Sequence, residues 1–262
     1  VIIAGGIDLS VGSVVGLASV VGTLAVVQDL ADSMHWIVFV IFALAVGAFA
    51  GLINGIVIAY GNVVAFMATL AMLVGARGLA EILAERRTLV VEDRSFITFM
   101  NSDILGVNML VWIFAIVAVL GWVLLNRTTF GRRTIAIGGN REAARLAGIN
   151  VKRHVMWLYV LVGLASGIAG VMFLGRTTAG SSTNGQLLEL DVIAAVVVGG
   201  TLLVGGRGTI TGTVFGVLIF ATLTNVFIQN NLSSSVQAVA KGVIIVVAVL
   251  LQQRFSRPPG RS

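Results

Sequence analysis

The sequence predicts an all-α polytopic membrane protein, and three observations lead to that fold class. Of its 262 residues, 58% are hydrophobic and only 11% are charged, with a mean hydropathy of +1.04. A soluble domain carries roughly 25% charged residues. Apolar runs of a length that crosses a bilayer recur along the chain, and short polar stretches separate them. Finally, the basic residues gather in one central polar island and in the tail.

The polar island runs from Arg127 to Arg153 and orients the chain. It holds seven basic residues against one acid, Glu142. Short basic loops of membrane proteins are retained in the cytoplasm. The island and the basic tail Arg254–Ser262 are therefore predicted inside. This rule accounts for the net charge of +6, so we expect a lipid bilayer around the chain and no nucleic-acid partner.

A helix break lies at the start of the chain. Val1–Ala4 reads as the tail of a span, and GGIDLSVGS at Gly5–Ser13 follows. Paired glycines followed by Asp and Ser end one helix and cap the next. The chain also begins without an initiator methionine or a signal-peptide pattern. We therefore expect one transmembrane domain, residues 1–262, whose N-terminal part precedes Val1.

The remaining apolar runs predict about eight complete spans beside the initial fragment. In chain order these are Val11–Val27, Trp36–Ala59, Val63–Leu83, Val107–Leu125, Val155–Leu174, Leu187–Gly205, Thr211–Gln229 and Ser235–Leu251. The loop Gln28–His35 has no Lys or Arg, and Glu85–Gly106 has three basic and four acidic residues. Both are predicted outside, and the longer one has room for a small extramembrane element.

The span Leu187–Gly205 is predicted to begin outside, with Glu189 and Asp191 at its outer end, and to finish in a tight inner turn at Gly205–Gly208. In another span, Arg77 and Glu81 are four residues apart and are expected to pair near the interface. The span Trp36–Ala59 is rich in Gly and Ala, which lets helices approach closely in lipid.

Asp8 is the acid that most needs an explanation, because a carboxylate beside a helix break in a membrane is costly unless it is capped, paired or near water. It is expected to cap the helix that starts at Leu9, and a direct part in a transport path is the alternative. The stretches Gly12–Gly16 and Gly212–Gly216 share a pattern of two glycines four residues apart. This similarity indicates either an internal duplication or two independent helix contacts.

Catalytic chemistry is not expected. The chain has no phosphate loop, no metalloprotease motif and no Ser/His/Asp set. The glycine-rich stretch Gly199–Gly208 lies between two apolar runs, so close packing and a tight turn explain it better than a phosphate cradle. The chain has no cysteine, and its two histidines, His35 and His154, are far apart, so neither a metal site nor a cofactor is expected.

Within the island, residues 140–148 predict a short helix, which Asn140 caps and Gly148 ends, with Glu142 in its first turn. Small alanines would let its backbone sit deep in a groove on another protein. The alternative is a solvated connector whose arginines only obey the inside rule.

Three motifs together resemble one family. These are GGIDLSVGS at Gly5–Ser13, GGNREAARLAGINV at Gly138–Val151, and IAAVVVGGTLLVGGRGTITGT at Ile193–Thr213. They are similar to the permease subunit of bacterial ABC importers for monosaccharides of the ribose, xylose and galactose group. The resemblance covers nearly the whole chain. The related permeases for branched-chain amino acids are one alternative, and a self-sufficient secondary transporter or channel is the other.

The resemblance implies a multi-pass permease of the bacterial inner membrane with about ten spans, which is not itself an enzyme. Its implied partners are a second permease copy, a cytoplasmic ATP-binding subunit that hydrolyses ATP, and a periplasmic or extracellular sugar-binding protein. The island 127–153 would be the coupling loop. Its implied ATPase-coupling residues are Asn140, Arg141, Glu142, Ala143, Ala144, Arg145, Ala147 and Gly148.

The chain departs from the family's longer Glu-Ala-Ala signature, of which Glu142, Ala143 and Ala144 form only the start. The helix-break motif is assigned to Gly5, Gly6, Asp8, Ser10 and Gly12. A sugar path needs polar and aromatic side chains, and the candidates within spans are Asn54, Asn62, Phe66, Thr69, Asn225 and Gln229. Each of these is also suited to an interhelical hydrogen bond, worth about 1 kcal/mol.

A secondary transporter would require buried ion-coupling carboxylates in mid-span, and the sequence places every acid except Asp8 at a span end or in a loop.

Overall fold

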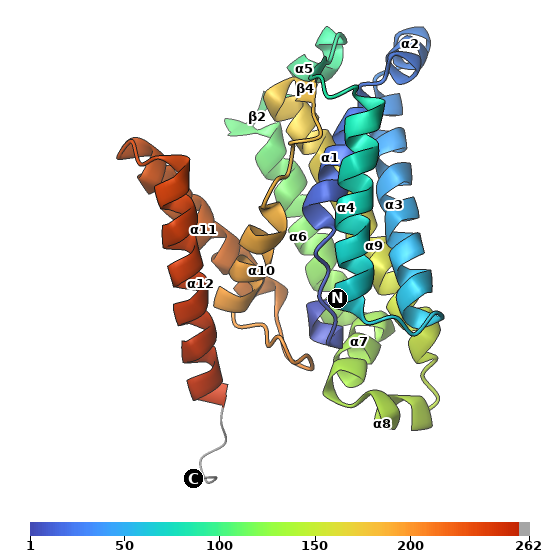
Figure 1. The fold of residues 1–262 in the computed structure, drawn as a ribbon, viewed down its shortest axis with the longest axis vertical. Helices are drawn as coiled ribbons and strands as arrows, with labels where there is room; N and C mark the ends of the chain where they lie inside the picture. The colour runs from blue at the N-terminus through green and yellow to red at the C-terminus, as the bar shows by residue number, and fades with distance from the viewer. Residues whose placement is uncertain (257–262) are drawn as a thin grey trace.

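The computed structural model describes residues 1–256 and confirms an all-α polytopic class (Figure 1). Side chains are described except at residues 234, 245, 248, 249 and 251–256. Within the described residues, five helices are long and apolar enough to cross a membrane. They are α3 (Ile37–Ala59), α4 (Ala65–Leu83), α6 (Met109–Arg127), α9 (Val151–Thr177) and α11 (Ile210–Gln229). Most of the predicted basic tail Arg254–Ser262 lies outside the described residues.

The core lies where α9 and α3 cross α1 (Val11–Gly22). α9 is the most buried of the long helices. Glycines let its backbone touch that of α3, since a Cβ on Gly47 would lie 2.1 Å from the carbonyl oxygen of Gly163. The small residues of the run Trp36–Ala59 thus serve close helix packing, as predicted. A second group, α10 (Leu188–Val198), α11 and α12 (Ser234–Ser256), stands beside this core (Figure 1).

The first predicted span is wrong at its outer end. Instead of one helix to Val27 and then a loop, α1 stops at Gly22 and a separate helix, α2 (Ala25–Ser33), follows at an angle of 57°. The Thr23 hydroxyl donates to the carbonyls of Ser19 and Val20, and Leu24 is extended, so the helix ladder is interrupted there.

The loop Glu85–Gly106, which is predicted outside and has room for a small element, contains a short helix. Asp93 caps α5 (Arg94–Met100) by accepting a hydrogen bond from Phe96 N at 3.0 Å. Two short antiparallel pairings flank this helix. They are β1 (Leu89–Val90) with β4 (Ala179–Gly180), and β2 (Asp103–Ile104) with β3 (Val107–Asn108).

The predicted span Leu187–Gly205 is also wrong, because α10 covers only 11 residues. After it the chain turns at Gly200 (φ +88°), Gly205 (φ +89°) and Gly206 (φ +80°), a backbone conformation that favours glycine. Before it, residues 181–187 run along α1 as irregular chain, held by a hydrogen bond from Asn184 Nδ2 to Ser19 Oγ at 3.1 Å. The glycine-rich stretch therefore serves turns and close packing, as predicted.

The polar island forms most of the opposite end of the molecule from α2 and α5 (Figure 1). It contains α7 (Thr129–Gly139), which the sequence did not indicate, and α8 (Arg141–Leu146), which it did. Gly206 N donates to Ile3 O at 2.8 Å, so the predicted inner turn rests on the initial 3-10 helix η1 (Ile2–Ala4). The predicted break follows η1, because Gly5 has φ +80° and α1 begins only at Val11.

Candidate functional site

The predicted coupling helix is α8, and its ends are built as the sequence indicated. Asn140 Oδ1 accepts a hydrogen bond from Ala143 N at 2.9 Å, and Glu142 lies in the first turn. Gly148 follows the helix with φ +80°. The Arg145 guanidinium lies 3.0 Å from Glu142 Oε2, an exposed ion pair worth about 0.5 kcal/mol at most. Local caps therefore define a helix of six residues, shorter than the predicted nine.

The two faces of α8 differ sharply. Ala144 is 4% exposed and packs in a cluster with Ile137 of α7 and Val155 of α9. Ala143 and Ala147 are exposed, and so is Leu146, at 82%. The outward placement expected for Ala144 is thus wrong, because this alanine anchors α8 to its own chain. Leu146 belongs to the outward face, and a leucine beside two arginines in a polar loop was the signal for it.

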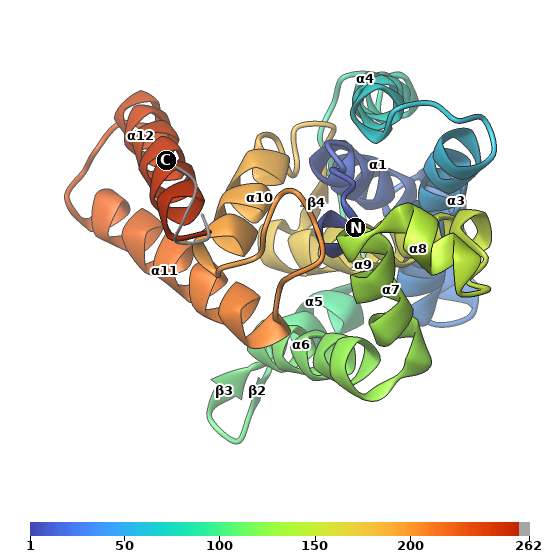
Figure 2. The ribbon, with the colours of Figure 1, turned by 90° about the horizontal axis from the view of Figure 1, so that it is seen from below.

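α8 is held at the edge of the molecule by neighbours that are themselves fixed (Figure 2). A Cβ on Gly138 of α7 would lie 1.8 Å from Ile3 O, so α7 packs directly on the initial segment. His154 at the start of α9 lies with its Nε2 2.8 Å from Thr134 Oγ1 of α7. α8 is therefore packed on α7 and α9, which in turn contact the initial segment and each other.

The helix-break motif forms a closed hydrogen-bond network. Asp8 Oδ1 accepts from Ser10 N at 2.8 Å and from Ser10 Oγ at 2.6 Å. Asn54 Nδ2 of α3 donates to the same Ser10 hydroxyl at 3.0 Å. Asp8 therefore fixes the turn before α1 and does not cap a helix beginning at Leu9, since α1 begins two residues later. The expectation of a local structural bond holds, but the bonded group is Ser10.

The six candidate path residues do not form one set. Asn54 and Thr69 are buried beside the break, where Thr69 Oγ1 donates to Ala65 O at 2.9 Å and lies 3.4 Å from Ile7 O. Asn62 lies in the turn after α3, and Phe66 is 46% exposed on α4. Asn225 and Gln229 bond to each other at 3.0 Å on the exposed side of α11. Asn54 and Thr69 contact the break, and Asn62 lines the cavity beside it.

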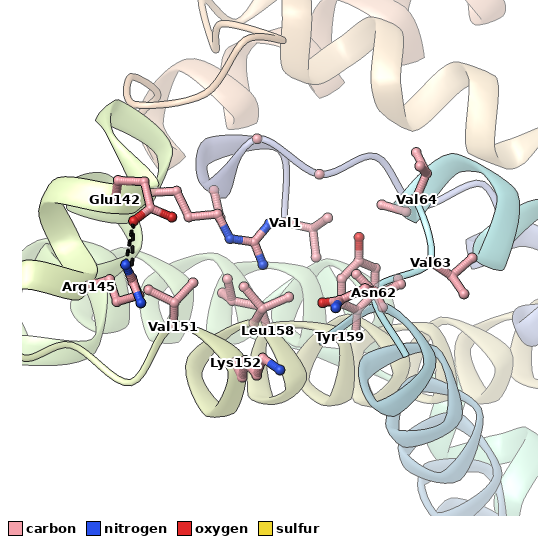
Figure 3. A pocket seen from close by; sticks show the side chains of 17 residues that line it. Val1, Asn62, Val63, Val64, Glu142, Arg145, Val151, Lys152, Leu158 and Tyr159 are labelled. Carbon is pink, nitrogen blue, oxygen red and sulfur yellow. Dashed lines mark hydrogen bonds and ion pairs between the residues drawn. The ribbon is translucent and has the colours of Figure 1, made fainter. Parts of the chain in front are cut away.

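A cavity of about 500 Å³ opens between the break and α8 (Figure 3). Asn62 and the Tyr159 hydroxyl lie together on one side, and the Glu142–Arg145 pair lies on the other. Arg141 and Lys152 also line it, so three basic side chains face one acid. Within the described residues, the buried Tyr159 hydroxyl has no hydrogen-bond partner. The cavity therefore lies between two predicted sites, the break and the coupling helix, and a few polar side chains interrupt its largely apolar wall.

Arg77 does not make its predicted pair with Glu81. Its Nη1 donates instead to the backbone carbonyls of Ser182 and, at 2.9 Å, of Asn184. Glu81 pairs with Arg86 near the outer end of the molecule at 3.4 Å. The irregular segment 181–187 leaves backbone carbonyls that no helix pairs, and the guanidinium of Arg77 satisfies two of them.

Two acids of α10 are placed differently from the prediction. Asp191 forms an ion pair with Lys241 of α12 at 2.7 Å, which ties α10 to α12. Glu189 is 8% exposed and lies against Gly12, the second residue of α1, rather than at an outer surface. Glu189 remains at a helix start, as predicted, but the structure buries it instead of placing it at an outer end. The burial of Glu189 was not predicted from the sequence because the helix that carries it begins well inside the molecule (Figure 1).

The chain was compared with known proteins. Residues 1–251 match the family described as "Branched-chain amino acid transport system / permease component". Ribose import permease protein RbsC of Bacillus subtilis (strain 168) is 40% identical over 258 residues, which cover 98% of this chain and 79% of that protein. L-arabinose transport system permease protein AraH of Escherichia coli (strain K12) is 41% identical over 258 residues, 95% of this chain and 75% of that protein. No solved structure matches.

Proposed function

Because the chain belongs to the family of branched-chain amino acid transport system permease components, we propose that it is the transmembrane subunit of an ATP-driven importer. The proposed cargo is a monosaccharide. The observation that carries the cargo class is the identity of 40–41% to a ribose and an L-arabinose permease over nearly the whole chain. The family description names branched-chain amino acids, which makes an amino-acid cargo the second candidate.

The proposed partners follow from this assignment. ATP is hydrolysed by a separate cytoplasmic chain, and a sugar-binding protein delivers cargo from the periplasm or the extracellular side. The site of action is the bacterial inner membrane, which this multi-pass chain crosses as one of two permease copies. The exposed side chains Ala143, Leu146 and Ala147 of α8 supply an apolar contact for the ATPase, with Arg141 and Arg145 beside them.

The proposed mechanism depends on the packing of α8 against α7 and α9. Movement of the ATPase displaces α8, and the buried Ala144 transmits this displacement to α7 and α9. α9 carries it along the glycine contacts to α3, and α3 reaches the break through the bond from Asn54 to Ser10. A helix break changes its backbone angles at a few residues, so it suits alternating access. The cavity between α8 and the break is the inner part of the path.

The polar residues of this path hold cargo weakly, since affinity belongs to the binding protein. Of the six candidates, Asn62 lines the proposed path and Asn54 and Thr69 support the break beside it, whereas Asn225 and Gln229 belong to the α11 surface. A channel or a secondary transporter needs no docking helix, so the capped α8 with its apolar outer face favours the ATP-driven importer.

The test is ATPase stimulation in a purified complex. The permease, the ATPase and the binding protein encoded beside it are assembled in nanodiscs, and ATP hydrolysis is measured with ribose, L-arabinose, xylose, leucine and valine. We expect a pentose to stimulate hydrolysis and the amino acids to have no effect. Stimulation by leucine or valine alone would reject the sugar assignment in favour of the second candidate.

A further inference from the structure

Two acids are buried within the described residues, Asp8 and Glu189, and they differ in how their oxygens are satisfied. Asp8 Oδ1 accepts two hydrogen bonds from Ser10. Glu189 is equally buried, at 8% exposure, yet its Oε2 has no hydrogen-bond partner in the described part of the chain. An unsatisfied buried acceptor costs about 1–3 kcal/mol, and more when it is charged. An ionisable side chain without a partner inside a membrane protein is a candidate for a functional role.

The surroundings of Glu189 consist largely of backbone. A Cβ added to Gly12 would lie 2.2 Å from Glu189 Oε2 and 2.2 Å from the carbonyl oxygen of Gly185. The carboxylate therefore occupies the space that a side chain at position 12 would take, and only glycine permits this contact. The first turn of α1 presents the positive end of the helix dipole to the carboxylate, which stabilises its charge and leaves its lone pairs available.

The nearest cation is already engaged. Arg77 lies against Gly16 of α1, one helical turn beyond Gly12, and its Nη1 is bound to the carbonyls of Ser182 and Asn184. It holds the irregular segment 181–187 in place rather than forming a salt bridge with Glu189. No ion pair with Glu189 occurs within the described residues.

The carboxylate of Glu189 lies where two helices begin. α1 begins after the extended break, α10 begins after the irregular segment 181–187, and the contact between Gly12 and Glu189 places the two helix starts side by side. Transporters place their cargo sites where discontinuous helices meet inside the membrane. The two stretches of similar glycine pattern, Gly12–Gly16 and Gly212–Gly216, both contact α10. Gly12 faces Glu189, and a Cβ on Gly216 would lie 1.9 Å from Ala195 O. α10 is thus fixed on both sides, with its acid at the junction.

We propose that Glu189 is a cargo-contacting residue, whose Oε2 accepts a hydrogen bond from a hydroxyl group of the monosaccharide as it passes between the starts of α1 and α10. This inference rests on the proposed function. A sugar offers hydroxyl donors on every face, and one carboxylate at a glycine-lined junction contacts them without building a tight site.

The test compares the effect of changing the Glu189 side chain with the effect of removing single hydroxyl groups from the cargo, in the manner of a double-mutant cycle. The whole complex, with its ATPase and binding protein, is reconstituted into proteoliposomes, and initial uptake of ribose and of its singly deoxygenated analogues is measured for wild type and Glu189→Gln. The same binding protein serves both permeases, so its own preferences cancel in the ratio of wild-type to variant rates. A matched control is Glu81→Gln, which removes an exposed acid on α4.

We expect Glu189→Gln to lower ribose uptake about tenfold, because the neutral amide oxygen is a weaker hydrogen-bond acceptor than the carboxylate. For the one analogue that lacks the contacted hydroxyl, the ratio should return to about one, as it should for every cargo in Glu81→Gln. A loss of equal size for all cargoes, or no loss at all, would overturn the inference and assign Glu189 a purely structural role.

Recovery of the ATPase with the purified permease reports whether the variant is folded. If the ATPase does not co-purify with Glu189→Gln, the variant Glu189→Asp is used instead, because it keeps the charge and shortens the side chain by one methylene. The same dependence of uptake on the cargo hydroxyls is expected, with a smaller loss of rate. A uniform loss in Glu189→Asp would also overturn the inference. The wild-type arm separates the two proposals. A wild-type complex that imports no monosaccharide rejects the proposed function and this inference together, whereas uniform losses with an active wild type reject only the inference.

Discussion

Gly47 of α3 and Gly163 of α9 are in mutual backbone contact, since a Cβ on either residue would lie about 2 Å from the carbonyl oxygen of the other. The same helix pair is joined again at Gly51, where a Cβ would lie 2.3 Å from Tyr159 O. No side chain can be inserted between these helices without separating them. The contact is the centre of the fold and, in the proposed mechanism, part of the route from α8 to the break.

This contact predicts a strong position dependence of Gly→Ala substitutions. Gly47→Ala should destabilise the folded protein by about 2 kcal/mol or more, because the methyl group meets backbone atoms that cannot turn aside. Gly75→Ala is the matched control, since no atom lies within 4 Å of a Cβ there. It should be neutral or stabilise by up to about 1 kcal/mol. Thermal unfolding in detergent measures both, and equal melting temperatures would contradict the packing account.

The Asp8 network predicts a graded series at the helix break. Asp8→Asn keeps an acceptor for Ser10 and should retain most of the expression and transport. Asp8→Leu leaves Ser10 N without its partner and should cost about 1–3 kcal/mol of stability. Expression, melting temperature and uptake are compared for the two variants. Loss of transport in a folded Asp8→Asn protein would show that the charge itself acts in transport, which is the alternative considered from the sequence.

The two faces of α8 predict two different defects for the same substitution. Ala147→Trp places a large ring on the exposed face and should leave folding intact while the ATPase no longer co-purifies. Ala144→Trp should instead reduce folding by about 2 kcal/mol, because Ala144 is buried among α7 and α9. Melting temperature and ATPase recovery are measured for each variant. Undiminished ATPase recovery and uptake with Ala147→Trp would mean that α8 is a simple connector.

The chain has no cysteine, so single cysteines report its orientation. Ser33 lies at the end of α2, and Ala136 is exposed on α7 at the opposite end of the molecule. Ser33→Cys should react with an impermeant thiol reagent in intact spheroplasts, and Ala136→Cys should react only after lysis. Thr134, in the same helix, is 4% exposed and would give no signal on either side. Labelling of Ala136→Cys in intact cells would reverse the predicted topology.

Sequence reasoning succeeded where a local rule decides the structure. Asn140 and Gly148 delimit α8 because caps depend on neighbouring residues alone. The small residues around Gly47 predicted close packing because only glycine permits it. The break at Gly5 was visible for the same reason.

It failed where the partner lies far along the chain. Arg77 was assigned to Glu81 on its own helix, and the carbonyls of Ser182 and Asn184 that bind it belong to a segment that reads as a loop. Asp191 was given no partner, because Lys241 stands in another apolar run. Glu189 read as a surface acid because hydropathy assumes that each apolar run is one straight helix, whereas α10 begins inside the molecule.

The central claim is that this chain imports a monosaccharide only when coupled to an ATPase. Its most direct test is uptake of labelled pentose into proteoliposomes that hold the permease, with or without the ATPase and with ATP or a non-hydrolysable analogue. The account predicts accumulation only when the ATPase, the binding protein and hydrolysable ATP are all present, and loss of accumulation with Ala147→Trp. Accumulation driven by an ion gradient, without the ATPase, would contradict it and establish a secondary transporter.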